Sequence, residues 1–205
     1  MIFRLCRFLL INQQKRPLNL VRLGFINTPL TGLMLIQRNP IEDARGFLSR
    51  LYSNEEFSHA GVSKPIVQIN HSYTHMKGAV RGLHYQTPPF SEAKIVNCLK
   101  GEIFDVAVDL RRDSSTFLHW YGEKLSASNN RSLLIPEGFA HGFQTLSENC
   151  ELIYFHTAPY VQDAEAGINV ADTVLGINWP LPIAEISDKD HSYPMIHPDF
   201  EGVSP

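Results

Sequence analysis

Residues 94–110, KIVNCLKGEIFDVAVDL, hold two apolar runs of strand length on either side of a turn. The first run is Lys94 to Leu99 and the second is Ile103 to Leu110. Short apolar runs bounded by turn residues are typical of buried strands. Lys100-Gly101 predicts a hairpin between them, because glycine accepts the positive φ of a tight turn.

Similar runs continue on both sides of this stretch. They are Leu33–Gln37, Phe47–Tyr52, Ile66–Asn70, Leu118–Leu125, Ser132–Ile135, Phe143–Leu146 and Glu151–Phe155. Short strands at this spacing predict an all-β sandwich or barrel. Helix is expected only around Asn54–His59 and around Ala171–Leu175. The five prolines after Trp179 predict a tail that wraps the barrel in extended form.

Length and composition limit the class of protein. With 205 residues and 43% apolar content the chain can bury a full core, and we expect one domain over residues 28–205. The net charge is −3, from 18 basic and 21 acidic residues. This balance gives no overall attraction to nucleic acid or to an anionic membrane, so we expect neither partner.

The three cysteines and the N-terminus bear on the compartment. Cys6, Cys98 and Cys150 are odd in number and far apart, which argues against a disulfide framework or a structural zinc site and favours the reducing cytoplasm. The apolar run Phe8–Asn12 is too short for a signal peptide or a membrane span. Residues 1–27 are therefore expected to be a loosely ordered extension, with an upstream start or an amphipathic surface contact as alternatives.

Two histidines lie in apolar, glycine-containing segments that predict strands. His84 belongs to Arg-Gly-Leu-His-Tyr-Gln at residues 81–86, and His141 follows the turn 136–138 between two small residues. Two imidazoles in one barrel interior favour acid–base chemistry on a small molecule. Arg81 and His84 point to opposite faces of a flat strand, but a bulge at Gly82 would bring both to the cavity. The alternative for His141 is a structural histidine.

Other polar residues have a structural and a functional interpretation. Strand alternation places Gln68, Asn70 and Ser72 on one face, which suits either a sugar ligand or the solvent side of an edge strand. Lys94 opens a buried run and is either an anion stabiliser or a solvated edge charge. Tyr154 is either a core residue or a proton donor, and the default role of Asp172 is a turn or helix cap.

Several blocks, taken in order, resemble one enzyme family. They are 43–47 (DARGF), 68–72 (QINHS), 81–86 (RGLHYQ), Lys94, 104–111 (FDVAVDLR), 135–143 (IPEGFAHGF), 165–168 (EAGI), Asp172 and 177–180 (INWP). Together they closely resemble the dTDP-4-dehydrorhamnose 3,5-epimerase family, over about residues 28 to 194. The resemblance implies a cupin-type jelly roll without a cofactor, acting as a homodimer on a nucleotide-linked 4-keto-6-deoxyhexose.

The resemblance also implies roles for the catalytic residues. A 4-keto group acidifies the hydrogens on C3 and C5, so inversion needs a base on one face of the ring, an acid on the other and a positive group near the enolate oxygen. His84 is the expected base, with Asp172 orienting its ring. Tyr154 is the expected acid, and Lys94 the expected enolate stabiliser.

The expected binding residues surround these four. Arg81 would contact the diphosphate, Gln68 and Asn70 the sugar or phosphate, and His141 the same pocket. Arg45 and Glu165, from two of the matching blocks, complete the expected set. The segment after Arg45, which the family uses to hold the nucleotide, departs from the family pattern, with Arg50 for a common glutamate and Leu48 for an aromatic residue. Ile69 also replaces a common aspartate between Gln68 and Asn70. The nucleotide and the exact sugar therefore stay open.

Different functions are also compatible with these residues. A metal-dependent cupin would use His84, Glu92 and His141, but Gln86 stands where its second histidine belongs and is a poor ligand for zinc or iron, so no metal is expected. A 3,4-ketoisomerase, a mono-epimerase or a non-catalytic protein that binds a sugar nucleotide would need the same pocket and no metal.

Overall fold

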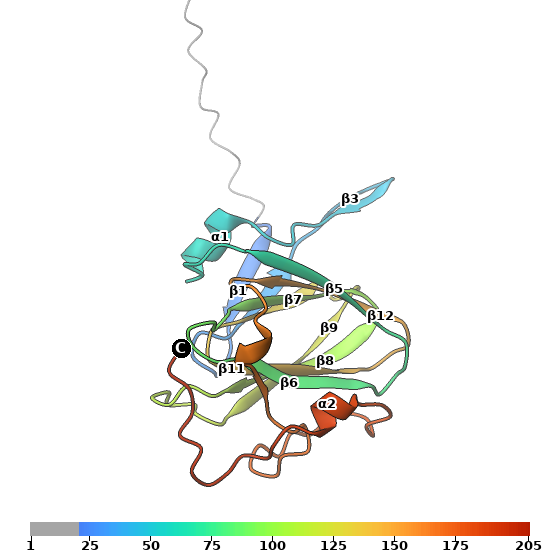
Figure 1. Ribbon diagram of the computed structural model, residues 1–205. Helices are drawn as coiled ribbons and strands as arrows, with labels where there is room; N and C mark the ends of the chain where they lie inside the picture. Colours follow the sequence, from blue (N-terminus) through green and yellow to red (C-terminus); the bar gives the residue numbers. More distant parts are fainter. Residues whose placement is uncertain (1–20) are drawn as a thin grey trace, which may run out of the picture.

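The computed structural model describes residues 21–205, which form two antiparallel β-sheets packed face to face (Figure 1). The six-stranded sheet has the order β1 (Leu23–Asn27), β2 (Met34–Arg38), β10 (Arg131–Ile135), β7 (Lys94–Lys100), β12 (Cys150–His156) and β5 (Gln68–Thr74). The five-stranded sheet has the order β13 (Glu165–Gly167), β6 (Val80–Gln86), β11 (Phe139–Thr145), β8 (Glu102–Asp109) and β9 (Trp120–Ser126). The expected all-β architecture is confirmed.

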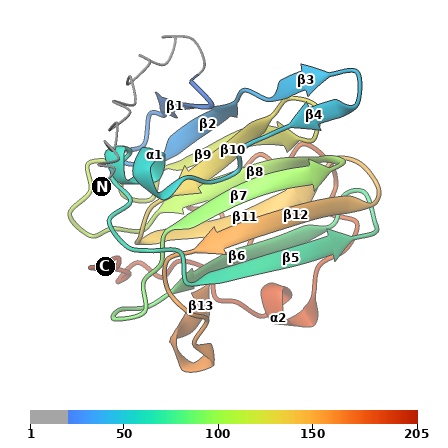
Figure 2. The ribbon, with the colours of Figure 1, turned by 90° about the horizontal axis from the view of Figure 1, so that it is seen from above.

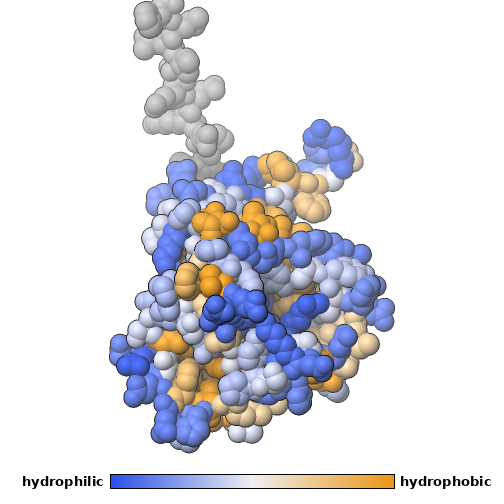
Figure 3. All heavy atoms as spheres, viewed as in Figure 1, coloured by the Kyte–Doolittle hydropathy of each residue, from blue (hydrophilic) through white to orange (hydrophobic). Residues whose placement is uncertain are grey.

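A small hairpin extends beyond the six-stranded sheet. It pairs β3 (Ile41–Asp43) with β4 (Gly46–Leu48), and Figure 2 shows it reaching past the edge of the main body. The expected strand Phe47–Tyr52 is thus confirmed only in its first two residues. In the space-filling view the tip of the hairpin is hydrophilic and apolar groups gather near its base (Figure 3).

Strand β8 carries buried apolar side chains on both of its faces because both faces are covered. Ile103 and Ala107 belong to the core between the two sheets. Val106 and Val108 face the other way and pack in a second cluster with parts of the C-terminal segment, including Trp179. Figure 1 shows this segment, drawn in orange and red, beneath the five-stranded sheet. The tail therefore forms a third layer, as expected of a chain that wraps the barrel.

The turn at Gly101 does not make the expected hairpin. Gly101 has φ +79°, but β7 pairs with β10 and β12 whereas β8 pairs with β9 and β11. The turn instead carries the chain from one sheet to the other. Local sequence predicts the turn but not the partners, because in a sandwich the partner strands lie far apart in the chain.

One of the two expected helices is confirmed. Helix α1 (Asn54–His59) has the predicted bounds, with Phe57 buried on its inner side. Residues Ala171–Leu175 form successive turns instead of a helix, so that expectation is wrong. The tail is not extended throughout either, since it contains helix α2 (Asp188–His191), and a short 3-10 helix, Gln162–Ala164, precedes β13.

The expected N-terminal extension is wrong for its last residues. Leu23–Asn27 form strand β1, which pairs in register with β2 at the edge of the six-stranded sheet. Leu23 is buried against Ile36 and Phe57, which accounts for a strand where the sequence offers only a short apolar run. The remainder of the expected extension, residues 1–20, lies outside the described residues.

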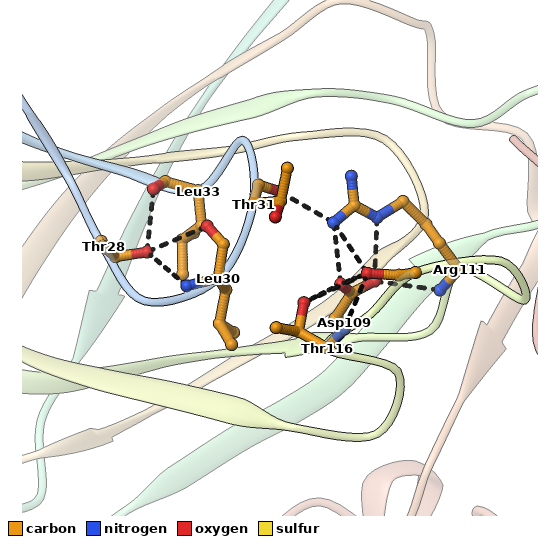
Figure 4. Close-up of polar contacts among 8 residues, drawn as sticks. Thr28, Leu30, Thr31, Leu33, Asp109, Arg111 and Thr116 are labelled. Carbon is orange, nitrogen blue, oxygen red and sulfur yellow. Dashed lines mark hydrogen bonds and ion pairs between the residues drawn. The ribbon is translucent and has the colours of Figure 1, made fainter.

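A polar network ties the turn before β2 to the end of β8 (Figure 4). The Arg111 guanidinium donates to the Asp109 carboxylate at 2.9 and 2.7 Å and to the Thr31 carbonyl at 2.8 Å. Thr116 donates to the same carboxylate at 2.7 Å. Across the turn, the Thr28 hydroxyl donates to the Leu33 carbonyl at 2.9 Å. Within residues 21–205, no helix is long and apolar enough to cross a membrane.

Candidate active site

The candidate residues gather around one cavity of about 260 Å³ between the two sheets. Its walls are Asn70, Ser72, Arg81, His84, Lys94, His141, Phe143, Tyr154 and His156. An adjoining cavity of about 130 Å³ is lined by Gln68, Asn70, His84, Tyr85, Gln86, Glu92, Lys94, His156, Tyr160 and Glu165. A cavity of about 280 Å³ beside helix α2 (Asp188–His191) is also lined by Arg81 and His84. Two larger cavities lie near Arg111, but Asp109 already holds that guanidinium and no histidine lines them.

Strand β6 carries both Arg81 and His84 to the cavity, as the expected bulge would. The pairing of β6 with β11 shifts register between His141 and Phe143. At this point Gly82, with φ +129°, lies so close to Gly142 that a Cβ on it would be 2.5 Å from the Gly142 Cα. The close backbone approach needs glycine on both strands. It also places His84 directly opposite His141.

The carboxylate that binds His84 is that of Asp190, on helix α2. The His84 Nε2 lies 2.8 Å from Asp190 Oδ1, and the Gly82 amide donates to Asp190 Oδ2 at 3.0 Å. Burial raises the pKa of Asp190, but the hydrogen bonds from His84 and Gly82 outweigh it and the pKa is lowered overall. An ionised carboxylate only accepts, so Nε2 carries the hydrogen and Nδ1 is left to take a proton.

Asp172 does not reach His84, and the prediction that it orients this ring is wrong. Its Oδ1 accepts from the Val174 and Leu175 amides at 2.8 and 2.9 Å, and its Oδ2 accepts from the Ile196 amide at 2.6 Å. Asp172 therefore has the default role of a residue in a turn, which is to cap backbone amides.

The sequence held one local sign of helix α2. Ser187 and Asp190 have the spacing of a helix N-cap, and the Ser187 hydroxyl accepts from the Asp190 amide at 3.1 Å. Nothing local shows that the Asp190 side chain meets a histidine 106 residues earlier. Asp190 was therefore missed because long-range packing, which the local sequence does not show, brings it to His84.

Tyr154 reaches the cavity from the sheet opposite His84. It lies on β12 in register with Asn70, packs against the core and shares a hydrogen bond of 3.0 Å with the Ser72 hydroxyl. Burial raises the pKa of the Tyr154 phenol well above its usual value near 10. The phenol is therefore protonated throughout the neutral range and is available as a proton donor.

Lys94 is buried on a central strand, so it is not a solvated edge charge. Its ammonium lies 2.9 Å from Glu92 Oε1, while Glu92 Oε2 lies 2.8 Å from His156 Nδ1. His156 also faces the cavity. Sequence analysis did not identify His156 as a site residue, although strand alternation from Tyr154 places both on one face.

His141 also has a carboxylate partner. Its Nε2 lies 2.7 Å from Oδ1 of Asp105, which is fully buried on the neighbouring strand β8. Burial raises the pKa of Asp105, although the charge of His141 acts in the opposite direction. Asp105 Oδ2 is buried without a hydrogen-bond partner. The structure thus pairs three cavity histidines with carboxylates: His84, His141 and His156.

Of the expected binding residues, all but Arg45 line the two cavities. Arg81 donates to the Thr74 hydroxyl at 3.1 Å, and Gln68 donates to Asn70 at 3.2 Å. Glu165 accepts from Tyr160 at 2.7 Å and from Lys189 at 2.5 Å.

Arg45 lies on the exposed hairpin, where it pairs with Asp43, and is not part of the cavity of its own chain. The Arg50 guanidinium, from the same segment, pairs with Glu56 at 2.8 Å. In the part of the chain that the structure describes, no three His, Cys, Asp or Glu side chains are arranged to hold a metal ion.

Comparison with known proteins assigns the chain to a family. The family model described as dTDP-4-dehydrorhamnose 3,5-epimerase matches residues 27–197. The chain is 42% identical to the Shigella flexneri dTDP-4-dehydrorhamnose 3,5-epimerase over 169 residues, which are 82% of this chain and 93% of that protein. It is also 42% identical to the Salmonella typhimurium enzyme, over 83% of this chain and 94% of that protein.

Solved structures agree in fold. The Bacillus anthracis enzyme with bound TDP and pyrophosphate has a TM-score of 0.82 at 39% identity, covering 85% of this chain and 99% of that one. The Legionella pneumophila enzyme in complex with dTDP-4-keto-L-rhamnose has a TM-score of 0.81 at 38% identity, covering 84% and 92%. The expected cupin-type jelly roll is thereby confirmed. Sequence match and shared architecture together place this chain in the dTDP-4-dehydrorhamnose 3,5-epimerase family.

Proposed function

We propose that this protein is an isomerase that inverts C3, C5 or both carbons of a dTDP-linked 4-keto-6-deoxyhexose. The observation that carries the proposal is the placement of His84 and Tyr154 on opposite sheets across one cavity, with Lys94 beside them. A base and an acid that face each other across a sugar ring are the requirement of an inversion through an enolate. The fold, the family and the relatives' substrates support the same reaction.

Each inversion is one proton removal followed by one proton return. His84 takes the proton from the carbon next to the ketone, and the C–H electron pair moves into the enolate, whose oxygen the Lys94 ammonium stabilises. Asp190, at 2.8 Å, stabilises the imidazolium that forms. Tyr154 then gives its phenolic proton to the opposite face of the same carbon, and solvent exchange resets both groups.

The remaining cavity residues hold the substrate. Arg81 binds the diphosphate, Gln68 and Asn70 bind sugar or phosphate oxygens, and His141 and Glu165 line the sugar pocket. The nucleotide is thymidine diphosphate, as in the names of the related proteins. The reaction feeds deoxysugar and polysaccharide synthesis in the cytoplasm, uses no cofactor and is carried out by a single domain that includes strand β1.

The protein acts as a homodimer. Val67, just before β5, and Ile69 on β5 are exposed at 54% and 56%, and the projecting hairpin exposes Phe47 and Leu48. Apolar surface of this kind favours a protein interface. In the dimer the hairpin would bring Arg45 to the partner's cavity. Light scattering after gel filtration tests this, and a particle with the mass of one chain contradicts it.

The decisive experiment follows deuterium from D₂O into dTDP-4-keto-6-deoxyglucose by NMR. Exchange at both C3 and C5 with inversion supports a 3,5-epimerase, and exchange at one carbon supports a mono-epimerase. Movement of the carbonyl identifies a 3,4-ketoisomerase, and binding without exchange identifies a non-catalytic protein. For His84→Ala we expect a loss of about two to four orders of magnitude in turnover. Near-normal turnover in this variant contradicts the proposed base.

A further inference from the structure

Glu92 is a buried carboxylate that holds two cavity side chains at once. Its two oxygens lie 2.9 Å from the Lys94 ammonium and 2.8 Å from His156 Nδ1. The side chains of Glu92, Lys94 and His156 are only 8%, 11% and 11% exposed. Such a carboxylate is costly to bury unless it is paired, so the contact specifies where both partners lie.

Sheet register explains why one carboxylate can reach both partners. Lys94 on β7 pairs with His156 on β12, which in turn pairs with Gln68 on β5. The three side chains therefore form one row across the sheet. Glu92 precedes β7 by two residues and closes the row at its end, with Tyr154 and Asn70 in the next row.

The hydrogen bonds around Glu92 run in one direction. Glu92 only accepts, so His156 carries its hydrogen on Nδ1. His156 Nε2 then accepts from the Asn70 amide at 3.4 Å, and Asn70 accepts from Gln68 at 3.2 Å. The Tyr160 amide donates to Gln68 at 3.0 Å. Burial raises the pKa of Glu92, but the bond from His156 and the charge of Lys94 outweigh it and lower the pKa.

Other ionisable groups around Lys94 already have partners or lack negative charge. They are Arg81 and His84 on β6, Asp105 on β8, His141 on β11, Tyr154 and His156 on β12, Glu165 on β13 and Asp190 on α2. Asp105 pairs with His141, Asp190 with His84 and Glu165 with Lys189. Among the described residues, Glu92 is the carboxylate in direct contact with Lys94.

We propose that Glu92 is a positioning residue that directs the Lys94 ammonium into the cavity and keeps it charged there, with His156 as the second group that Glu92 holds. The inference rests on the proposed role of Lys94 as enolate stabiliser. A desolvated ammonium loses its proton more readily, and an adjacent carboxylate opposes that loss. Glu92 thus extends the pH range over which the site can stabilise an enolate.

Glu92→Gln tests this by removing the charge while keeping the shape. In this variant we expect the midpoint of the alkaline loss of kcat to lie about one pH unit or more below that of the wild type. The reason is that the carboxylate charge that opposes loss of the Lys94 proton is gone. Glu92→Asp keeps the charge with a shorter reach and is expected to lie between the two. The same alkaline midpoint of kcat in all three proteins overturns the proposal.

A matched control is available on the outer face of the same sheet. Glu151 also contacts one lysine and one histidine, with 3.4 Å to Lys100 Nζ and 3.4 Å to His71 Nε2, but these side chains are far more exposed. Because water screens both contacts of Glu151, Glu151→Gln is expected to leave the pH profile of kcat unchanged.

A second readout does not depend on turnover. Acetic anhydride acetylates an amine but not an ammonium, so the pH at which Lys94 becomes modified, read by mass spectrometry, reports its charge. We expect Lys94 to react at lower pH in Glu92→Gln than in the wild type, and an equal midpoint overturns the proposal. If Glu92→Gln does not fold, Glu92→Asp is compared in the same way, with a smaller downward shift expected.

The two readouts separate the inference from the function on which it rests. If the wild type does not turn over the sugar nucleotide but the Lys94 midpoint still moves, the proposed function fails and the role of Glu92 in holding the charge stands. If turnover is normal and the midpoint does not move, the role of Glu92 fails alone.

Discussion

At the scale of single residues, two aspartates of the C-terminal segment have different tasks. Asp190 directs its carboxylate to His84, whereas Asp172 uses its carboxylate to accept three backbone amides. Both are buried. Burial therefore does not separate them, and only the partner identifies the residue that acts with the proposed base.

Asp190→Asn and Asp172→Asn form a pair of variants with opposite expected effects. Asp190→Asn is expected to lower kcat by about two orders of magnitude or more, because an amide can donate to His84 and favour the wrong tautomer. Asp172→Asn is expected to cost about 1 kcal/mol of stability as a weakened cap while leaving kcat near normal. Steady-state kinetics and urea denaturation of both variants check this. A folded Asp172→Asn variant with the larger loss of kcat would restore the sequence-based assignment.

Tyr154→Phe separates proton removal from proton return. We expect the variant to keep forming the enolate at His84 but to lose inversion by about two orders of magnitude, because the opposite face has no donor. Hydrogen exchange and product configuration, followed by NMR in the same sample, measure the two steps. Tyr121→Phe is the control, since Tyr121 also packs on the core and burial and Glu123 raise its pKa to about 12. Loss of inversion in the control as well would contradict the assignment.

At the scale of elements, the site depends on how closely β6 approaches β11. Gly82 and Gly142 let the two backbones meet where their register shifts, so that Arg81 and His84 both face the cavity. The sequence predicted a bulge at Gly82 from glycine alone. It could not predict Gly142 as the other half of the contact, because a glycine's neighbour across a sheet is a tertiary property.

Gly142→Ala is expected to destabilise the fold. Its Cβ would lie 2.7 Å from the Arg81 carbonyl oxygen, a backbone atom that cannot turn aside, and we expect a cost of about 1 to 3 kcal/mol. Gly24→Ala in β1 is the control, with its nearest neighbour at 3.7 Å and an expected change within about 0.5 kcal/mol. Urea denaturation measures both. Equal stability of the two variants would show that the strands move apart without cost.

At the scale of the whole molecule, the sequence predicted most of the strands and most of the residues that line the cavity. It did not predict which strands pair or which side chains contact each other. The apolar runs of β7, β8 and β12 are visible in the sequence because each of these strands packs apolar side chains on both faces, β8 against the tail and β7 and β12 in the cluster with Phe57. The Lys100-Gly101 turn was visible too, but not that it joins two sheets. Strand β1 and the Asp190 contact were missed because long-range packing, not local pattern, creates them.

Asp109→Asn tests how the network in Figure 4 holds the molecule together at low pH. Burial raises the pKa of Asp109, but bonds from Arg111, Ser114 and Thr116 outweigh it and lower the pKa below the ordinary 3.8. Its stabilisation is thus full above about pH 4 and is lost as pH falls through the lowered value. We expect Asp109→Asn to cost about 1 to 3 kcal/mol at pH 7 and less near pH 3.

Urea denaturation at several pH values checks this expectation. Asp43→Asn is the matched control, because Asp43 and Arg45 form the same fork two residues apart but on the exposed hairpin. Water screens that pair, so no change in stability is expected. If the difference in unfolding free energy between wild type and Asp109→Asn stays constant down to pH 3, the Asp109 carboxylate is not the group that titrates.

The attachment of helix α2 to His84 also has a consequence for synthesis of the chain. Every strand of the two sheets ends by residue 167, whereas Asp190 follows in the covering tail. A ribosome therefore translates all strands of the two sheets before it adds the aspartate that holds His84. The strands and the imidazole of His84 thus come first in synthesis, and the carboxylate that holds this imidazole is added after them.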